Sequence, residues 1–186
     1  MKLLIVYATT EGQTKKICSF LAQKAKEEGH NVTFINALER HIHPQQYDAA
    51  VVGASIHAGK YLQVVQKYVN ENHKDLNHKP SAFISVSLTA ASEKPQSNVD
   101  LPKITQLFLD STRWNPTFIE QVAGALRYSK YNFFKKLIMR LIAQKNGGST
   151  DTSKDHEYTD WDQVERIIKL LERAVTDQSQ EKQTVH

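Results

Sequence analysis

The chain has 186 residues, of which 40% are hydrophobic and 24% charged, and its formal net charge is +4 at pH 7. This composition suits one globular domain with a core on both sides of a sheet, and the length excludes two full domains. The single cysteine, Cys18, excludes an intramolecular disulfide, and no run of about twenty apolar residues is present to span a bilayer. We expect a cytoplasmic protein, because the N-terminal stretch MKLLIVYATTEGQ soon turns polar and lacks the cleavage region of a secretory signal.

The first half of the chain alternates apolar runs with helical patterns. Residues 2–8 (KLLIVYA) are almost all apolar, which is typical of a strand buried on both faces. Residues 12–29 follow with apolar side chains at helical spacing. Further strands are predicted at 31–37 and 47–55, and a helix at 61–73.

The second half continues this alternation. A strand is predicted at 81–88, a helix at 101–111 and a strand at 116–126. Two amphipathic helices are then predicted, at 131–145 and 160–175.

The last helix is expected to be capped by Thr159 or Asp160, because both side chains offer an oxygen to the first backbone amides. Residues 177–186 are polar and are expected to form a frayed tail. The chain is therefore predicted to be a single domain over residues 1–176.

Strands that are separated by helices predict right-handed crossovers and a parallel sheet that is covered on both faces. Five such strands predict an α/β, flavodoxin-like, doubly wound five-stranded parallel sheet, with an extra basic amphipathic helical segment after the fifth strand. In this fold a ligand lies beyond the carboxyl ends of the strands. The loops at those ends are the place to look for a site.

The loop after the first strand, ATTEGQT, has the composition of a phosphate site. Thr9, Thr10 and Thr14 offer hydroxyls, and Gly12 lets a ligand approach the backbone closely. The backbone amides from Glu11 onward open a helix whose N-terminus attracts an anion. The alternative is that these threonines and the glycine only cap the helix.

Two further loops are expected at the same edge of the sheet. The stretch GASIHAGKY follows the third strand, and SVSLTAAS follows the fourth. Together with the first loop they form the walls of a predicted slot, and the residues concerned are Ser55, Ile56, His57, Ala58 and Gly59 on one side and Ser87, Leu88 and Thr89 on the other.

The first loop resembles the flavodoxin phosphate pattern Ser/Thr-x-Thr-Gly-x-Thr, with Glu11 in place of the usual threonine. This carboxylate would repel a phosphate unless it points away. Taken with VVGASIHAGKY, PSAFISVSL, VAGALRYSKY, GGSTDT and YTDW, the loop makes the chain resemble the menaquinone-dependent protoporphyrinogen IX dehydrogenases of bacterial haem synthesis. The resemblance runs from Lys2 to the last helix.

The resemblance implies an enzyme that binds FMN, oxidises protoporphyrinogen IX to protoporphyrin IX and passes the electrons to menaquinone or ubiquinone. It implies that the second and third loops flank the isoalloxazine ring, and no catalytic residue is carried over. By the same resemblance the phosphate is held by Thr9, Thr10, Glu11, Gly12, Gln13 and Thr14.

Flavodoxins usually stack an aromatic side chain from the second loop on the flavin. Here that loop offers only His57 and, further on, Tyr61. The shortage of a large aromatic residue leaves room for a flat porphyrinogen or quinone. Two other functions stay open: an electron-transfer flavodoxin that docks to protein partners, and a flavin-dependent quinone reductase.

Residues 121–150 contain no acidic side chain but six basic ones. Such a block indicates an anionic partner. As a basic amphipathic helix it suits the anionic inner face of the cell membrane, where a lipid quinone is reached, and its side chains also suit porphyrinogen propionates. The alternative is a helix packed on the sheet. The candidate residues for substrate or membrane are Arg127, Tyr128, Lys130, Lys135, Lys136 and Arg140.

The remaining candidates point to ordinary structural roles. His41 and His43 lack a cysteine or carboxylate partner at ligand spacing, so no metal is expected. Cys18 lies on an apolar background and is expected to be inert. Asp151 and Asp155 are either proton acceptors or turn residues. No nucleic acid is expected as a partner, and a homo-oligomer stays open.

Overall fold

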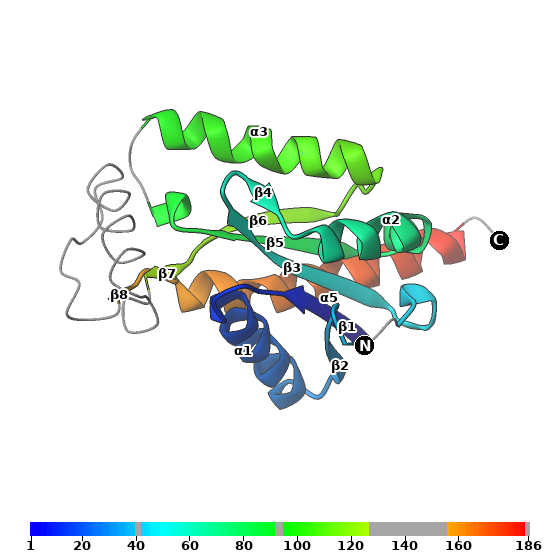
Figure 1. The fold of residues 1–186 in the computed structure, drawn as a ribbon. Coiled ribbons are helices and arrows are strands. Elements are labelled where there is room, and N and C mark those ends of the chain that lie inside the picture. The colour runs from blue at the N-terminus through cyan, green and yellow to red at the C-terminus, as the bar shows by residue number, and fades with distance from the viewer. Residues whose placement is uncertain (40–41, 92–94, 127–155, 185–186) are drawn as a thin grey trace.

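The fold is a parallel sheet with helices on both faces (Figure 1). It is taken from a computed structural model, which describes residues 1–39, 42–91, 95–126 and 156–184. The strand order is β2-β1-β3-β5-β6, all in parallel register, and this confirms the predicted flavodoxin-like sheet.

The five parallel strands coincide closely with the five apolar runs of the sequence. The three central strands, β1, β3 and β5, are buried along most of their length, as a sheet covered on both faces requires, whereas the edge strands β2 and β6 are mostly half-buried. A short antiparallel strand, β4 (Lys60–Tyr61), pairs with the end of β3. The bounds of the five are β1 (Lys2–Ala8), β2 (Asn31–Asn36), β3 (Ala49–His57), β5 (Ser81–Ser87) and β6 (Phe118–Ala123).

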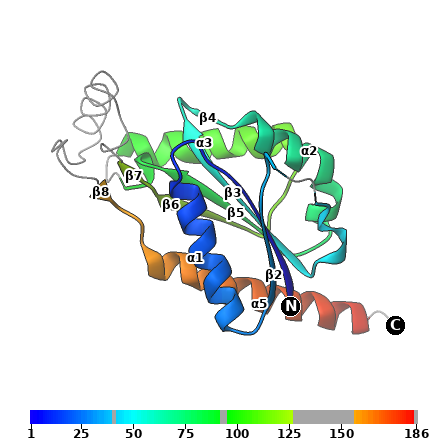
Figure 2. The ribbon, with the colours of Figure 1, turned by 60° about the horizontal axis from the view of Figure 1, so that its bottom comes forward.

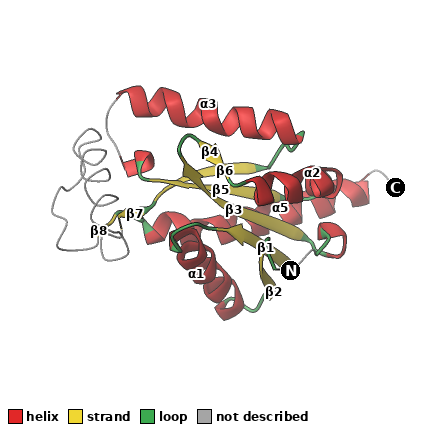
Figure 3. Cartoon of the chain, viewed as in Figure 1, coloured by secondary structure: helices red, strands yellow, loops and turns green. Residues whose placement is uncertain are grey.

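Four described α-helices flank the sheet (Figure 3). Two turns of 3-10 helix, η1 (Pro44–Gln46) and η2 (Thr89–Ala91), lie in loops. Two short strands, β7 (Ala125–Leu126) and β8 (His156–Glu157), pair with each other outside the main sheet. The helices are α1 (Gln13–Glu27), α2 (Gln63–Asn77), α3 (Pro95–Thr112) and α5 (Trp161–Thr184).

The helices form two layers, and each closes its own core. Leu3 and Ile5 of β1 point to the layer of α1 and α5, whereas Leu4 and Val6 point to the layer of α2 and α3 (Figures 1 and 2). This alternation follows from the two-residue period of a strand. Both faces of β1 are thereby removed from water, which holds its carboxyl end in a fixed position.

Aromatic rings fill the core beneath α3. Phe83 stacks on Phe108 with ring centroids 5.0 Å apart, and Trp114 meets Phe83 edge-on at 5.4 Å. Tyr61 packs on both phenylalanines, and its hydroxyl bonds the side chains of Ser85 and Thr105 at 2.7 and 3.0 Å. Tyr61 is therefore a core residue, with 8% of its surface exposed.

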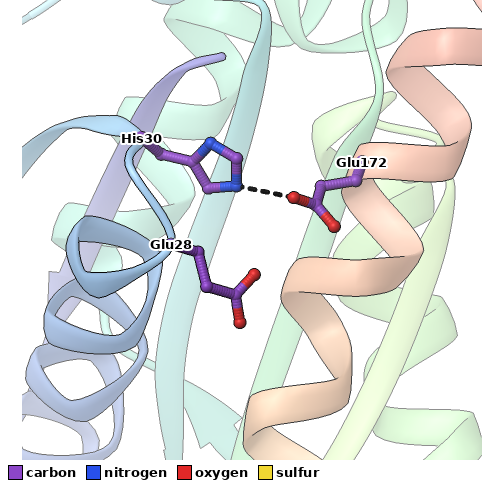
Figure 4. Close-up of side chains that lie close together, drawn as sticks. All are labelled: Glu28, His30 and Glu172. Carbon is purple, nitrogen blue, oxygen red and sulfur yellow. Dashed lines mark hydrogen bonds and ion pairs between the residues drawn. The ribbon is translucent and has the colours of Figure 1, made fainter.

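Charged side chains fasten α5 to the end of α1 (Figure 4). His30 Nε2 lies 2.9 Å from Glu172 Oε1, and Lys169 Nζ lies 2.8 Å from Glu28 Oε2 and 3.5 Å from Glu172 Oε2. The hydrogen bond to Glu28 raises the pKa of Lys169. The ligand atoms of the two glutamates and the histidine lie within 4.8 Å of one another, a spacing that suits a cation. The ammonium of Lys169 already takes that role between the carboxylates.

The last helix is longer than predicted, because α5 continues to Thr184 through residues that were expected to fray. No proline or glycine interrupts this stretch, and Gln178 Nε2 donates to the carbonyl of His78 at 3.0 Å. Asp160 provides the cap, since its Oδ1 accepts from the Gln163 amide at 3.1 Å. The helix predicted at 131–145 lies outside the described residues. Within the described part of the chain, no helix has the length and apolarity needed to cross a membrane.

Candidate functional site

A cavity of about 320 Å³ opens at the carboxyl ends of the strands, on the side where β7 and β8 lie in Figure 1. Its walls are the loops that follow β1, β3, β5 and β6. This is the edge at which doubly wound sheets bind ligands, and the volume lies within the usual range for small-molecule sites.

The structure brings the three predicted loops together around this one cavity. Gly12 is the single predicted cofactor residue that is absent from the lining, and it lies in the turn just before α1. The sequence analysis missed Val86, Gly124 and Ala125, which complete the wall. The predicted residues that line the cavity are Thr9, Thr10, Glu11, Gln13, Thr14, Ser55, Ile56, His57, Ala58, Gly59, Ser87, Leu88 and Thr89.

The first loop leads into α1 through a left-handed glycine. Gly12 has φ +92°, a value that side chains with a Cβ rarely adopt, and its amide donates to Thr9 Oγ1 at 2.9 Å. The N-cap residue of α1 is Gly12, which has no side chain to cap the first backbone amides of the helix. Thr14 Oγ1 is buried and has no hydrogen-bond partner among the described residues.

These two features suit an anion that carries several oxygen atoms. An uncapped N-terminus of a 15-residue helix attracts negative charge, and a buried hydroxyl without a partner is costly unless a ligand completes it. The oxygen atoms of a phosphate monoester can accept hydrogen bonds from the helix N-terminus and from the Thr14 hydroxyl. Among the described residues that line the cavity, Glu11 and His57 are the ionisable ones, and a basic side chain of lysine or arginine is absent from that set.

A tight hairpin forms the second wall. His57 pairs with Lys60, so Ala58 and Gly59 are the two turn residues, with φ of +49° and +75°. Positive φ at both positions is the geometry of a type I′ turn. Ala58 pays a steric cost there that glycine would avoid. This strained turn places the end of β3 against the cavity.

The third and fourth loops support each other. The Gly124 amide donates to the carbonyl of Ser87 at 2.9 Å, and the Ala90 amide donates to Ser87 Oγ at 3.1 Å. A Cβ on Gly124 would come within 3.4 Å of Val86 Cγ1. This is an ordinary van der Waals distance, so the hydrogen bond of the Gly124 amide, and not a lack of space for a side chain, defines this point of the wall.

No aromatic side chain occurs among the described residues that line the cavity. The imidazole of His57 is the side-chain ring in this set, and it is exposed at the end of β3. A flat ligand in the cavity would therefore not stack on a phenylalanine, tyrosine or tryptophan of the described lining.

The other candidates take structural positions or lie outside the described residues. Cys18 is fully buried, and burial raises the pKa of its thiol to about 12. His43 Nδ1 hydrogen-bonds Asn72 Oδ1 at 2.8 Å. The candidates that lie outside the described residues are His41, Arg127, Tyr128, Lys130, Lys135, Lys136, Arg140, Asp151 and Asp155.

Comparison with known proteins gives a match in both sequence and fold. The flavodoxin domain family matches residues 4–153. Protoporphyrinogen IX dehydrogenase (quinone) of Escherichia coli K12 is 40% identical over 176 residues, covering 92% of this chain and 94% of the relative. The protein of the same name from Leishmania major is 36% identical over 170 residues, covering 89% of this chain and 72% of the relative.

Among solved structures, the rubredoxin oxygen:oxidoreductase of Desulfovibrio gigas aligns with a TM-score of 0.55 and 15% identity. That alignment covers 95% of this chain and 36% of the other. A flavo di-iron protein of Thermotoga maritima aligns with a TM-score of 0.52 and 14% identity, covering 94% of this chain and 36% of that one. At these identities the likeness concerns the fold alone.

Proposed function

Since the chain belongs to the quinone-dependent protoporphyrinogen IX dehydrogenase family of flavodoxin domains, we propose that it oxidises protoporphyrinogen IX to protoporphyrin IX. In each step two electrons and two protons leave the porphyrinogen and reach a quinone, which becomes a quinol. The observation that carries the proposal is the match to the Escherichia coli dehydrogenase along nearly the full length of both chains.

The cofactor of this flavodoxin domain is a flavin, and we propose that it is FMN. The first turn of α1 and the Thr14 hydroxyl would hold the phosphate, which supplies the acceptors that the site lacks. The loops at Ser55–Gly59 and Ser87–Thr89 would flank the isoalloxazine ring. The ring supplies the two-electron chemistry, and these residues only bind and orient it.

The described residues that line the cavity include no phenylalanine, tyrosine or tryptophan, and this supports a flavin with an open face. A porphyrinogen and a quinone are both flat and bulky, and each needs to reach the ring in turn. The described lining residues beside the ring are small or aliphatic, apart from His57. This arrangement favours the dehydrogenase over an electron carrier, which needs to expose only an edge of its flavin.

We propose further that the protein works at the cytoplasmic, inner face of the cell membrane without crossing it. A lipid quinone is reached there, and the basic block at 121–150 carries six cations and no acidic residue. Anionic lipid attracts such a block by about 1 kcal/mol for each cation near the surface. The same cations suit the propionates of a porphyrinogen, so Arg127, Lys130 and Arg140 are candidates for either role.

The proposed reaction is tested anaerobically, with FMN-loaded protein, protoporphyrinogen IX and a menaquinone analogue. Porphyrin fluorescence is followed with and without the quinone, and with flavin-free protein as the control. We expect porphyrin only where flavin and quinone are both present. Flavin binding without porphyrin formation, with menaquinone and ubiquinone analogues alike, would instead support an electron-transfer flavodoxin.

Replacing Glu11 by threonine is expected to tighten FMN binding. Glu11 lines the cavity in the phosphate loop, where its carboxylate would add a negative charge beside the phosphate. Two like charges a few ångströms apart at a protein surface repel by about 1 kcal/mol or more, so Glu11→Thr should bind FMN about tenfold more tightly.

Titration of flavin fluorescence measures this effect, and riboflavin provides the internal comparison because it lacks the phosphate. The affinity of Glu11→Thr for riboflavin should stay within about twofold of the wild-type affinity, because riboflavin has no phosphate beside residue 11 and substitutions away from a bound group have small effects. Glu181→Thr, at the exposed far end of α5, is the matched control. Equal FMN affinities for Glu11→Thr and wild type would show that the carboxylate points away from the phosphate.

A further inference from the structure

The segment between β8 and α5 runs across the loops that surround the cavity. The Tyr158 amide donates to the carbonyl of Gly124 at 3.1 Å, and Thr159 Oγ1 donates to the carbonyl of Ala123 at 2.8 Å. Ala123 is the last residue of β6, and Gly124 follows it directly. The segment is therefore attached to the fourth wall of the cavity by its backbone and by a side chain.

The same hydroxyl also reaches the phosphate loop. Gln13 Nε2 donates to Thr159 Oγ1 at 3.0 Å, and Gln13 is only 6% exposed. Thr159 Oγ1 thus accepts a hydrogen bond from Gln13 and donates its single hydrogen to Ala123. Gln13 is the first residue of α1, and it precedes Thr14, whose buried hydroxyl has no partner among the described residues.

This bridge joins two parts of the site that the sheet does not hold together directly. In the order β2-β1-β3-β5-β6, two strands separate β1 from β6. The first turn of α1 follows β1, and Gln13 and Thr159 are 146 positions apart in the chain. The Thr159 hydroxyl therefore sets the position of the α1 N-terminus relative to the end of β6.

A second acceptor limits how much the bridge contributes. Gln13 Nε2 lies 3.2 Å from Glu157 Oε1, and the other oxygen of Glu157 is paired with Lys16 Nζ at 2.7 Å. Without the Thr159 hydroxyl, Gln13 Nε2 would keep its bond to the Glu157 side chain. Glu157 pairs with Ala125 rather than with β6 itself, so the link between the first turn of α1 and the end of β6 would be longer and less direct.

We propose that Thr159 is a positioning residue for the flavin phosphate, acting through Gln13. This assignment rests on the proposed flavin site and adds to it a residue that does not line the cavity. Its hydroxyl holds the first turn of α1 in place, so that the helix N-terminus and the Thr14 hydroxyl can act on the same phosphate. The loops beside the ring are held by other contacts, such as the hydrogen bond from Gly124 to Ser87.

The test compares FMN with riboflavin in a Thr159→Val variant, which keeps the shape of the side chain but removes the hydroxyl. We expect FMN affinity to fall about tenfold, as for the loss of one or two hydrogen bonds, with riboflavin affinity nearly unchanged. Thr159→Ser should restore FMN binding, because it keeps the hydroxyl. Thr176→Val is the control, since that hydroxyl bonds only the Glu172 carbonyl within α5.

The Gln13→Met variant and the double variant test the bridge from its other side. Gln13→Met removes the amide from the other side of the bridge together with its bond to Glu157, so its effect should be at least that of Thr159→Val, and Thr159→Val should add nothing to it in the double variant. Gln13→Met also carries the test if Thr159→Val does not fold. An equal loss of FMN and riboflavin affinity, or no loss, would overturn the role of Thr159. Failure of the wild-type chain to bind either flavin would overturn the proposed function, and this assignment with it.

Discussion

Replacement of residues 127–155 by a two-residue Asn-Gly turn is expected to leave a folded chain that binds flavin but no longer oxidises protoporphyrinogen IX. The folding part follows from β7 and β8, in which Leu126 pairs with His156 in antiparallel register. Paired residues of antiparallel strands have Cα atoms about 5 Å apart, and Asn-Gly closes such a gap as a type I′ turn.

The loss of activity follows from the charge that the replacement removes. All six cations of the basic block leave with residues 127–155, and every described residue that lines the cavity remains. If two of those cations bind the propionates, at about 1.5 kcal/mol each, kcat/KM should fall at least about 100-fold. Flavin titration and the anaerobic porphyrin assay measure the two properties on the same variant.

A charge variant separates the basic residues from the rest of the segment. The full-length chain with Arg127, Lys130, Lys135, Lys136, Arg140 and Lys145 replaced by glutamine keeps the length and removes the charge. Sedimentation with vesicles of anionic and of neutral lipid shows whether the same cations bind a membrane. Full dehydrogenase activity of the turn variant would contradict a role for residues 127–155 in the reaction.

A second large effect is expected from Gly53→Ala in the middle of β3. A Cβ at this position would lie 2.3 Å from Cys18 Sγ and 3.3 Å from Thr14 Cγ2, so α1 would have to move away from the sheet. Forced overpacking of this kind costs about 1–3 kcal/mol, and here we expect the upper end because Cys18 is fully buried. Urea denaturation measures the loss.

Cys18→Ala provides the sharpest check on this explanation. The Cys18→Ala substitution alone should lower the free energy of unfolding by about 1 kcal/mol, because it leaves a small cavity. In the double variant the new Cβ gains the space of the sulfur atom, so most of the Gly53→Ala loss should disappear. If the two losses simply add, the contact with Cys18 is not the cause, and displacement of the backbone of β3 would have to be considered instead.

The sequence predicted the strands well because burial on both faces leaves a continuous apolar run, and that pattern is local. The ends of β1, β3 and β5 could be located for the same reason, and so could the loops beyond them. The fourth loop was missed, because the sequence analysis predicted residues 116–126 as one strand. It is broken at Gly124, where the amide turns to the carbonyl of Ser87 on the neighbouring strand. That contact is tertiary and leaves no local pattern.

Other features depend on residues far apart in the chain. Thr159 and Asp160 were equal candidates for the helix cap, and the choice of Asp160 follows from the use of the Thr159 hydroxyl between Gln13 and Ala123. The contact of His30 with Glu172 spans 142 positions. The pairing of β7 with β8 likewise joins two dipeptides with no recognisable strand pattern.

The position of α5 has a consequence for how the chain is made. Val164, Ile167 and Leu171 complete the core that Leu3 and Ile5 begin, so the first strand depends on the last helix. During synthesis the ribosome releases the N-terminal part first. One face of the sheet must therefore wait, with its apolar side chains uncovered, until α5 emerges. Nascent chains that stall before that point would be natural clients of chaperones that bind exposed hydrophobic surface.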